Sequence, residues 1–426
     1  MFPYRKTKYS LDIVFPNKMY GGVYSLGPLI IYNLVNQRKD WYCERVFLDH
    51  GKIQAALVGF SLQYELDLPK ALAMKPKQGI TFAGGPVAEL HTKEIAKHFD
   101  FLILGDIEAV LPQVLEEWEK GEKDFLKRIY FLPGVYQAGK QSITKAKLQS
   151  LDDAAYPLVQ PFPEIINENY VFGKCFILEI ERGCPFSCHF CVIPQFYEGK
   201  MKYHSLNSLK KIIDEGLAIN HVQRIIIYSP SFVHPQRKEL LKYLLEKKIR
   251  VSFPSIKAEH MDLETLQLMK ACGQKSFTIA PECGERLRFT INKKVKDEEY
   301  FSFVQRCNQA GIEKLKLYMM IGLPEMEKED IEEAAYFIQE MKRRFKGRLY
   351  LSINYFVPKP KTIFSRQEFD KKKAKEQEKI LLQKLQNIKI KMPKLSASYK
   401  EWLLLKDLDE EGQIKDVANN KYQGHY

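Results

Sequence analysis

The sequence predicts an α/β protein with two domains built on parallel sheets and a small helical C-terminal extension. Short apolar runs of strand length alternate with segments of helical spacing over residues 1–138. The alternation stops over residues 139–173 and starts again over residues 174–360. Because continuous apolar strands joined by helices form parallel sheets covered on both faces, both alternating regions are expected to be parallel α/β domains.

Residues 1–138 are predicted to form an open, doubly wound, Rossmann-like sheet. Several of the expected strands end in turn-forming residues, among them Gly84-Gly85-Pro86 and Gly105-Asp106. The expected strands cover residues 10–15, 45–48, 55–60, 80–83 and 101–104, and the expected helices cover residues 24–36 and 110–118.

Residues 139–173 are predicted to be an inter-domain linker, because prolines stand among Asp and Asn and no periodicity is present. Residues 174–360 then carry six strand–helix units, too few for a closed eight-stranded barrel. They predict a partial (β/α)6 barrel of the TIM type, in which the loops that follow the strands build the active site. The expected strands are residues 175–180, 223–228, 250–253, 276–280, 314–321 and 348–356, and the expected helices are residues 206–218, 237–247, 262–271, 297–310 and 328–344.

Residues 361–426 form a Lys-rich C-terminal extension, with an amphipathic helix expected over residues 369–388 and a short apolar run at 402–405. The lysines of the helix stand among glutamates, which is typical of a solvated helix with ion pairs between successive turns. Contact with RNA or another anionic substrate is the alternative.

Composition excludes several classes of protein. With 45% hydrophobic and 28% charged residues in 426, the chain is neither disordered nor fibrous. No apolar stretch is long enough for a membrane-spanning helix, and the N-terminus does not resemble a secretory signal, so a soluble, cytoplasmic protein is expected. The net charge of +13 permits an anionic partner.

Eight cysteines without an export signal do not indicate a disulfide framework. Five are scattered and are expected to be buried thiols, namely Cys43, Cys175, Cys272, Cys283 and Cys307. The other three, Cys184, Cys188 and Cys191, have the spacing C-x3-C-x2-C in the loop directly after the first barrel strand.

Three thiolates on one short loop can bind three irons of a 4Fe–4S cluster and leave the fourth iron open. An open position distinguishes a catalytic metal centre from a closed structural one. The alternatives are a Cys3His zinc site that uses His189 or a distant histidine, and redox-active or structural thiols.

On these residues the sequence resembles the radical SAM enzymes, with Phe190 at the aromatic position of their cluster motif. The resemblance implies a 4Fe–4S cluster whose open iron binds S-adenosylmethionine, which one electron cleaves to a 5′-deoxyadenosyl radical. It also implies an external reductant such as flavodoxin or ferredoxin.

Further segments at expected strand ends carry the same resemblance. Residues 279–288 look like the fourth-strand segment of the family, which implies that Glu282, with Arg286 or Arg288, helps to hold adenosylmethionine. Gly322-Leu323-Pro324 looks like the fifth-strand motif that shapes the adenosylmethionine pocket, and residues 354–360 resemble a sixth-strand ending.

One segment departs from the family pattern. Where many members carry Gly-Gly-Glu after the second strand, this chain has Ser229 and Ser231, which offer hydroxyl groups without charge. The departure affects the expected contact to the ammonium group of adenosylmethionine.

Residues 1–138 are similar to the cobalamin-binding domain that precedes the barrel in one radical SAM subgroup, through Gly84, Gly85 and Gly105 at the ends of strands. The resemblance implies a cobalamin site. The Asp-x-His-x-x-Gly pattern that supplies an axial histidine is absent. The alternative is a retained scaffold that shapes the substrate entrance.

The resemblance leads to three hypotheses for function. The first is cobalamin-dependent methyl transfer to an unactivated carbon or phosphorus centre. The second is a radical rearrangement or ring-forming reaction without net methylation, and the third is a non-catalytic iron–sulfur electron-transfer or scaffold protein. The sequence does not distinguish a small-molecule, peptide or RNA substrate, and it assigns no catalytic acid or base.

Overall fold

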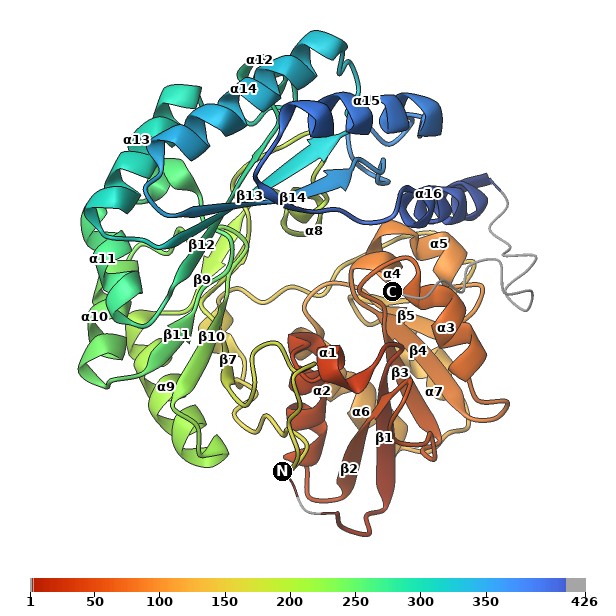
Figure 1. Cartoon of the computed structure of the whole chain (residues 1–426). Helices are drawn as coiled ribbons and strands as arrows, with labels where there is room; N and C mark the ends of the chain where they lie inside the picture. The colour runs from red at the N-terminus through yellow and green to blue at the C-terminus, as the bar shows by residue number, and fades with distance from the viewer. Residues whose placement is uncertain (1, 3, 411–426) are drawn as a thin grey trace. The chain divides into compact units, whose positions relative to one another are not determined.

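The computed structural model describes residue 2 and residues 4–410 (Figure 1). These residues form two compact units. The first comprises the chain up to Ile177, the segment Ile212–Val222 and the chain from Leu403; the second comprises Leu178–Lys211 and Gln223–Trp402. Among the described residues, no helix has the length and apolar character needed to cross a membrane.

The first unit is a doubly wound sheet, as predicted. Its strands are β1 (Tyr9–Phe15), β2 (Trp41–Phe47), β3 (Leu57–Ser61), β4 (Ile80–Gly84), β5 (Phe101–Ile103) and β6 (Val135–Tyr136). They lie in the order β2-β1-β3-β4-β5-β6, and all adjacent pairs are parallel except β5 with β6. The order reverses between β1 and β3, which is the switch point of such folds.

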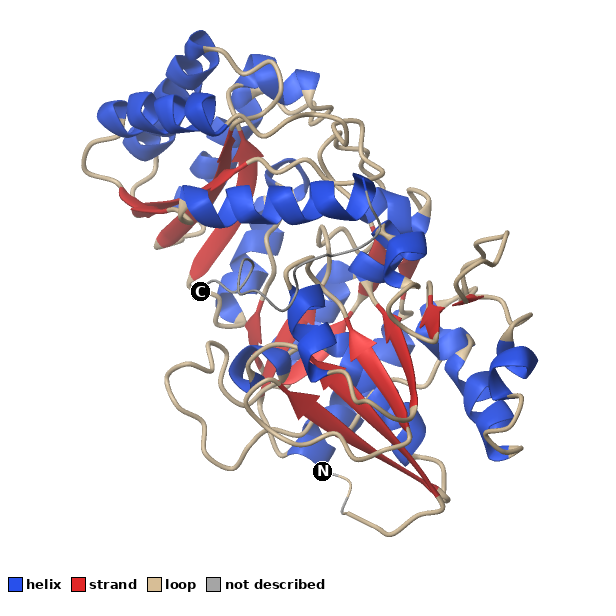
Figure 2. Ribbon diagram, turned by 90° about the vertical axis from the view of Figure 1, so that its right-hand side faces the viewer, coloured by secondary structure: helices blue, strands red, loops and turns tan. Residues whose placement is uncertain are grey.

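Helices cover both faces of this sheet (Figure 2). Successive side chains of β1 point to opposite faces of the sheet, so the sheet has a buried core on each face. Leu11 and Ile13 belong to one buried cluster and Val14 belongs to the other. On the first face lie α2 (Leu26–Asn36), α6 (Leu111–Glu119) and α7 (Phe125–Ile129); on the second lie α3 (Asp67–Met74), α4 (Pro86–Leu90), α5 (Thr92–Ile95) and the C-terminal part of α16 (Leu395–Glu410). The sequence did not predict α3, α4, α5 and α7, which are too short for a clear helical period.

Residues 139–173 contain no strand or helix except the short turn η2 (Leu151–Asp153). Side chains of the first unit bind this segment. The amide of Asn33 donates to the carbonyl oxygen of Val159 at 2.7 Å and accepts from its N–H at 3.0 Å. The segment therefore packs as part of the first unit.

The second unit contains two sheets, in the orders β11-β10-β7 and β12-β13-β14-β15. Their strands are β7 (Phe176–Glu179), β10 (Arg224–Tyr228), β11 (Arg250–Ser252), β12 (Ser276–Glu282), β13 (Lys314–Ile321), β14 (Arg348–Tyr355) and β15 (Lys389–Lys391). The helices between the strands are α9 (Leu206–Asn220), whose residues from Ile212 onward belong to the first unit, α10 (Arg237–Glu246), α11 (Leu263–Ala271), α13 (Asp297–Gln309) and α14 (Lys328–Arg344).

Six of these strands correspond to the six predicted for the partial barrel. The two sheets are joined less regularly than the prediction implies. After β11 the Ile256 N–H donates to the carbonyl oxygen of Thr278 at 2.9 Å, and this bond links the segment after β11 to β12.

A small antiparallel hairpin of β8 (Glu181–Gly183) and β9 (Met201–Tyr203) encloses the cysteine loop and the short helix α8 (Ile193–Tyr197). Gly183 has a φ of +95°, and a Cβ atom there would collide with the carbonyl oxygen of Lys200. The close approach of the two strands therefore requires glycine at this position.

The C-terminal extension contains α15 (Lys371–Lys384) and α16, as a helical extension predicts, and also the strand β15, which pairs in parallel with β14. A strand of sequence Lys-Ile-Lys has too few apolar residues to be recognised from its pattern. The last part of the predicted extension, residues 411–426, lies outside the described residues.

Candidate functional site

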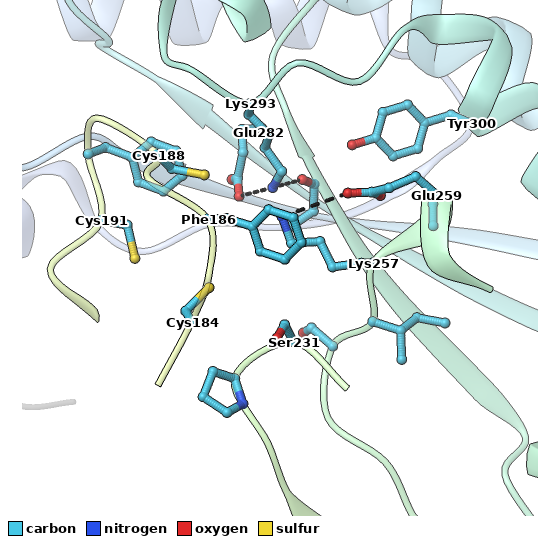
Figure 3. Close-up of a pocket in the computed structure, with 16 residues that line it drawn as sticks. Cys184, Phe186, Cys188, Cys191, Ser231, Lys257, Glu259, Glu282, Lys293 and Tyr300 are labelled. Carbon is cyan, nitrogen blue, oxygen red and sulfur yellow. Dashed lines mark hydrogen bonds and ion pairs between the residues drawn. The ribbon is translucent and has the colours of Figure 1, made fainter. Parts of the chain in front are cut away.

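A pocket of about 170 Å³ in the second unit brings together loops that follow four strands (Figure 3). Its lining comes from the segments after β8, β10 and β11, from the last residues of β12, and from Lys293 and Tyr300 further along the chain, which is the end of the strands where a barrel carries its chemistry. The polar and sulfur-bearing side chains of the lining are Cys184, Cys188, Cys191, Ser231, Ser255, Lys257, Glu259, Glu282, Lys293 and Tyr300.

The three clustered cysteines lie on one side of this pocket, all on the loop after β8 (Figure 3). All three are free, half-buried thiols. Two contacts to the segment after α12 (Glu285–Thr290) hold the loop: His189 donates its N–H to the carbonyl oxygen of Ile291 at 3.0 Å, and the Asn292 amide donates to the carbonyl oxygen of Ser187 at 2.9 Å. The loop is thus fixed on both sides of Cys188.

Burial raises the pKa of the Cys188 thiol, and it raises the pKa of Cys191 to about 11. A thiol ligand must lose its proton, so both side chains need a nearby cation to become thiolates. Iron supplies such a charge, and the donor set of three thiols on one loop fits a 4Fe–4S cluster.

The arrangement of donors also bears on the zinc alternative. Within the described residues, no three His, Cys, Asp or Glu side chains converge closely enough to hold one ion. A zinc site requires such convergence, whereas the thiolates of a 4Fe–4S site bind different irons. The His189 ring packs edge-on against Phe364, with ring centroids 5.9 Å apart. The imidazole of His189, the histidine within the cysteine loop, therefore lies against a phenyl ring.

An ion pair of Glu282 and Lys293 forms another part of the pocket. Their charged atoms are 2.9 Å apart, and the side chains are only 11% and 8% exposed. Burial alone would lower the pKa of Lys293, but the adjacent carboxylate raises it above its ordinary value. Lys293 also donates to the carbonyl oxygen of Ala280, which fixes its ammonium group.

The backbone at Glu282 is strained. Its φ is +74°, in the left-handed region, and the pairing of β12 with β13 shifts register between Ile279 and Glu282. A residue other than glycine held there costs on the order of 1–3 kcal/mol, and such strain concentrates at functional sites. The irregular end of β12 turns the carboxylate of Glu282 into the pocket (Figure 3).

Two charged residues of the pocket lining, Lys257 and Glu259, follow β11 and were not predicted as site residues. The ammonium of Lys257 lies 3.7 Å from the ring centre of Phe186 and 3.8 Å from a carboxylate oxygen of Glu259. Their position after a barrel strand is the signal that could have found them. They add a second cation and a second carboxylate to the pocket.

The two serines after β10 have different surroundings. The hydroxyl of Ser229 donates to the carboxylate of Glu181 and accepts from the N–H of Phe232. Ser231 lines the pocket, and its buried hydroxyl has no hydrogen-bond partner in the described part of the chain. Of the two, only Ser231 presents an unsatisfied group to a ligand.

Neither predicted arginine is part of the pocket lining that the structure describes. Arg288 is fully buried and donates to the carbonyl oxygens of Val295 at 2.7 Å and Cys283 at 2.9 Å, and it pairs with Asp297 at 2.9 Å. These bonds hold the turn after β12.

Arg286 is largely exposed and pairs with Asp330, with charged atoms 2.6 Å apart. The segment Gly322-Leu323-Pro324 also lies outside the described lining. The Gly322 N–H donates to the side-chain oxygen of Gln377 at 2.8 Å, which ties the end of β13 to α15.

In the first unit, the glycines at predicted positions end β4 and follow β5. Gly85 has a φ of +99°, and a Cβ atom would lie 2.6 Å from the carbonyl oxygen of Leu62. Gly105 has a φ of +88°, and a Cβ atom there would collide with the carbonyl oxygen of Ala146. Gly84 ends β4, next to β5. Internal packing accounts for glycine at 85 and 105, so these positions do not by themselves indicate a ligand.

Comparison with known proteins relates this chain to the radical SAM superfamily. The profile of the Radical SAM superfamily matches residues 178–338. The Uncharacterized protein MJ0966 of Methanocaldococcus jannaschii is 30% identical over 434 residues, which cover 96% of this chain and 91% of that protein. Hopanoid C-3 methylase of Methylococcus capsulatus is 26% identical over 183 residues, or 38% of this chain and 33% of the methylase.

Two solved structures share the fold. The radical S-adenosylmethionine methyltransferase TsrM from Kitasatospora setae, with cobalamin and a [4Fe-4S] cluster bound, superposes with a TM-score of 0.62 at 13% identity over 84% of this chain and 74% of that one. The cobalamin-dependent S-adenosylmethionine radical enzyme OxsB superposes with a TM-score of 0.59 at 14% identity over 98% of this chain and 64% of that one.

Proposed function

This chain belongs to the radical SAM superfamily, and we propose that Cys184, Cys188 and Cys191 hold its 4Fe–4S cluster. Enzymes of this superfamily use that cluster together with S-adenosylmethionine. When bound, the cluster supplies the electron that cleaves adenosylmethionine to methionine and a 5′-deoxyadenosyl radical. The observation that carries the proposal is the pocket in which the three free thiols face the buried Glu282–Lys293 pair.

The charged side chains of the pocket suit the amino-acid end of adenosylmethionine. Its ammonium group requires a carboxylate and its carboxylate a cation. Glu282 offers the first, and Lys293 holds Glu282 in position. Lys257 offers the second, and the free hydroxyl of Ser231 adds a hydrogen bond. The rings of Phe186 and Phe190 line the same pocket and exclude water from it.

The reaction that we propose is methylation of an unactivated centre, with a cobalamin-bound methyl group carried by the first unit. The support is the fold, because the chain superposes on both cobalamin-containing enzymes over most of its length. The sequence similarity to a hopanoid methylase over 183 residues, or 38% of this chain, adds to this support. Gly85 and Gly105 add no support, since close contacts within the first unit already require glycine at both positions.

The same glycine contacts favour a second candidate. If the first unit is a scaffold without a corrinoid, the enzyme would catalyse a radical rearrangement or cyclisation. This candidate also accounts for the absence of the Asp-x-His-x-x-Gly pattern.

The electron for either reaction comes from an external reductant, and a flavodoxin or ferredoxin would serve. All eight cysteines are free thiols.

Metal analysis separates the two reactions. The protein is purified without oxygen, reconstituted with iron and sulfide, supplied with hydroxocobalamin, and analysed for iron and cobalt after gel filtration. About four irons with one retained cobalt per chain is the expected result for methylation. About four irons without cobalt would exclude the corrinoid reaction and leave the rearrangement.

A further inference from the structure

A second cavity, of about 200 Å³, lies on the sheet β12-β13-β14-β15. Its lining consists of Ser276, Lys316, Tyr350, Leu351, Lys389 and Lys391. The lining therefore contains three lysines and two hydroxyl groups, and it contains no carboxylate. Two of the lysines come from β15, the strand of the C-terminal extension.

Strand register places these side chains side by side. Lys316 of β13 pairs with Tyr350 of β14, which pairs in turn with Lys389 of β15. Because adjacent parallel strands are about 4.8 Å apart, the three residues form one row across the sheet. Lys391 stands two residues further along β15, so it points to the same face.

The lysines of the cavity lack the ion pairs that other lysines of the extension make. Within the described part of the chain, the ammonium of Lys316 lies 3.2 Å from the hydroxyl of Tyr318, and no acidic side chain forms an ion pair with Lys316, Lys389 or Lys391. By contrast, Lys373 pairs with Glu327 at 3.0 Å. Cations gathered without counter-charges repel one another, and a bound anion would relieve that repulsion.

The cavity lies on the same face of β12 as the cysteine pocket. Ser276 lines the cavity, and Ala280, four residues along the strand, lines the pocket. Even-numbered steps keep side chains on one face, and four residues of strand span roughly 13 Å. An elongated molecule on this face could reach from the cavity to the pocket.

We propose that this cavity binds a phosphate or carboxylate group at one end of an elongated small-molecule substrate. The inference rests on the proposed function, since it places the other end of that substrate at the adenosylmethionine pocket. Ammonium groups bind such anions as point charges, and the hydroxyl of Tyr350 can donate to an anion oxygen. The small volume suits one anionic group rather than a stretch of nucleic acid. β15 thus gives the Lys-rich extension a part in substrate binding.

Calorimetric titration of the reconstituted full-length protein with inorganic phosphate, and separately with acetate, tests the proposal. The variant Lys389→Gln/Lys391→Gln is expected to bind the anion about tenfold more weakly, or worse, because two charge-assisted contacts are lost. The control Lys372→Gln/Lys379→Gln removes the same charge from exposed positions of α15 and is expected to bind like the unaltered protein. Tighter binding of phosphate or of acetate identifies the group that the substrate carries.

The proposal is overturned if the unaltered protein binds neither anion, or if both double variants weaken binding equally. If the first double variant does not fold, Lys391→Gln alone is titrated, because that exposed lysine contributes charge without packing. Phosphate binding is also measured on Cys188→Ala protein. If the Cys188→Ala protein lacks iron and still binds phosphate, the cavity binds anions independently of the cluster. Failure of the proposed function would instead appear as missing iron in the unaltered protein.

Discussion

The ammonium group of Lys293 lies 2.9 Å from a carboxylate oxygen of Glu282, and the two side chains are almost fully buried at the end of β12. Eleven residues separate them in the chain, and the strained backbone of Glu282 brings the carboxylate to the lysine. The pair is therefore a fixed, internally neutral element of the pocket, and its loss would leave an uncompensated buried charge.

Replacing Lys293 by methionine is expected to lower the free energy of unfolding by about 3 kcal/mol, because Glu282 would remain buried without its partner. Lys294→Met is the matched control, since the neighbouring lysine is exposed and should change stability by less than about 0.5 kcal/mol. Guanidinium unfolding at neutral pH measures both. Equal stability of the two variants would show that the pair does not hold the site.

Arg288 is expected to act on the pocket only through the turn that it holds. Arg288→Lys should destabilise the protein by about 3 kcal/mol, because a lysine cannot reproduce the bonds of the planar guanidinium. Arg286→Lys should destabilise the protein less than Arg288→Lys does, because the Arg286 side chain is half exposed and a lysine there can still pair with the buried carboxylate of Asp330. To test this, thermal unfolding and the affinity for adenosylmethionine are measured for both variants. If Arg288→Lys weakens that affinity without changing stability, the arginine contacts the ligand.

Asp262 caps the N-terminus of α11, where its carboxylate accepts the N–H of Thr265 at 2.8 Å. Asp262→Ala should therefore lower the free energy of unfolding by about 1 kcal/mol, and Asp262→Asn, which keeps the cap, by less. Although partial burial opposes it, the bonds from Lys238 and Thr265 lower the pKa of Asp262 to about 2.

A carboxyl group with a depressed pKa stabilises the fold above its unfolded pKa of about 3.9, and that stabilisation disappears as pH falls towards 2. Urea unfolding between pH 6 and pH 3 should thus show that the free energy of unfolding falls less on acidification in Asp262→Asn than in the unaltered protein. Identical acid profiles would contradict the assigned contacts.

Alanine at Cys184, Cys188 or Cys191 is expected to abolish stable iron binding after reconstitution, because each thiolate holds a different iron. Cys283→Ala is the matched control, since that buried thiol lies beside Glu282 but outside the described pocket lining. Iron per chain and the visible absorption of the cluster are measured for all four variants. Full iron content in any of the first three would remove that cysteine from the ligand set.

The fold could be predicted from the sequence because its strands are continuous apolar runs, and the sheet order of the first unit confirms the doubly wound prediction. The cysteine loop could be identified as a candidate cluster site because the spacing of its three cysteines is visible within one short segment of the sequence. The side to which Arg288 turns could not be predicted, since it depends on the carbonyl oxygens that face it in the folded turn. The same holds for β15, whose three residues become a strand only through pairing with β14.

Lys257 shows a further limit of sequence reasoning. Its distance of 3.7 Å to the ring centre of Phe186 joins residues that are far apart in the chain, and no local pattern marks such a contact. Only the folded chain brings the loop after β8 next to the segment after β11.

Electron paramagnetic resonance of the reduced, reconstituted protein, recorded before and after addition of S-adenosylmethionine, tests the central claim most directly. The account predicts a 4Fe–4S signal of about four irons per chain, which changes when adenosylmethionine is added because one iron is open to it. An unchanged signal, or a protein that retains one zinc and no iron, would contradict the assignment of Cys184, Cys188 and Cys191.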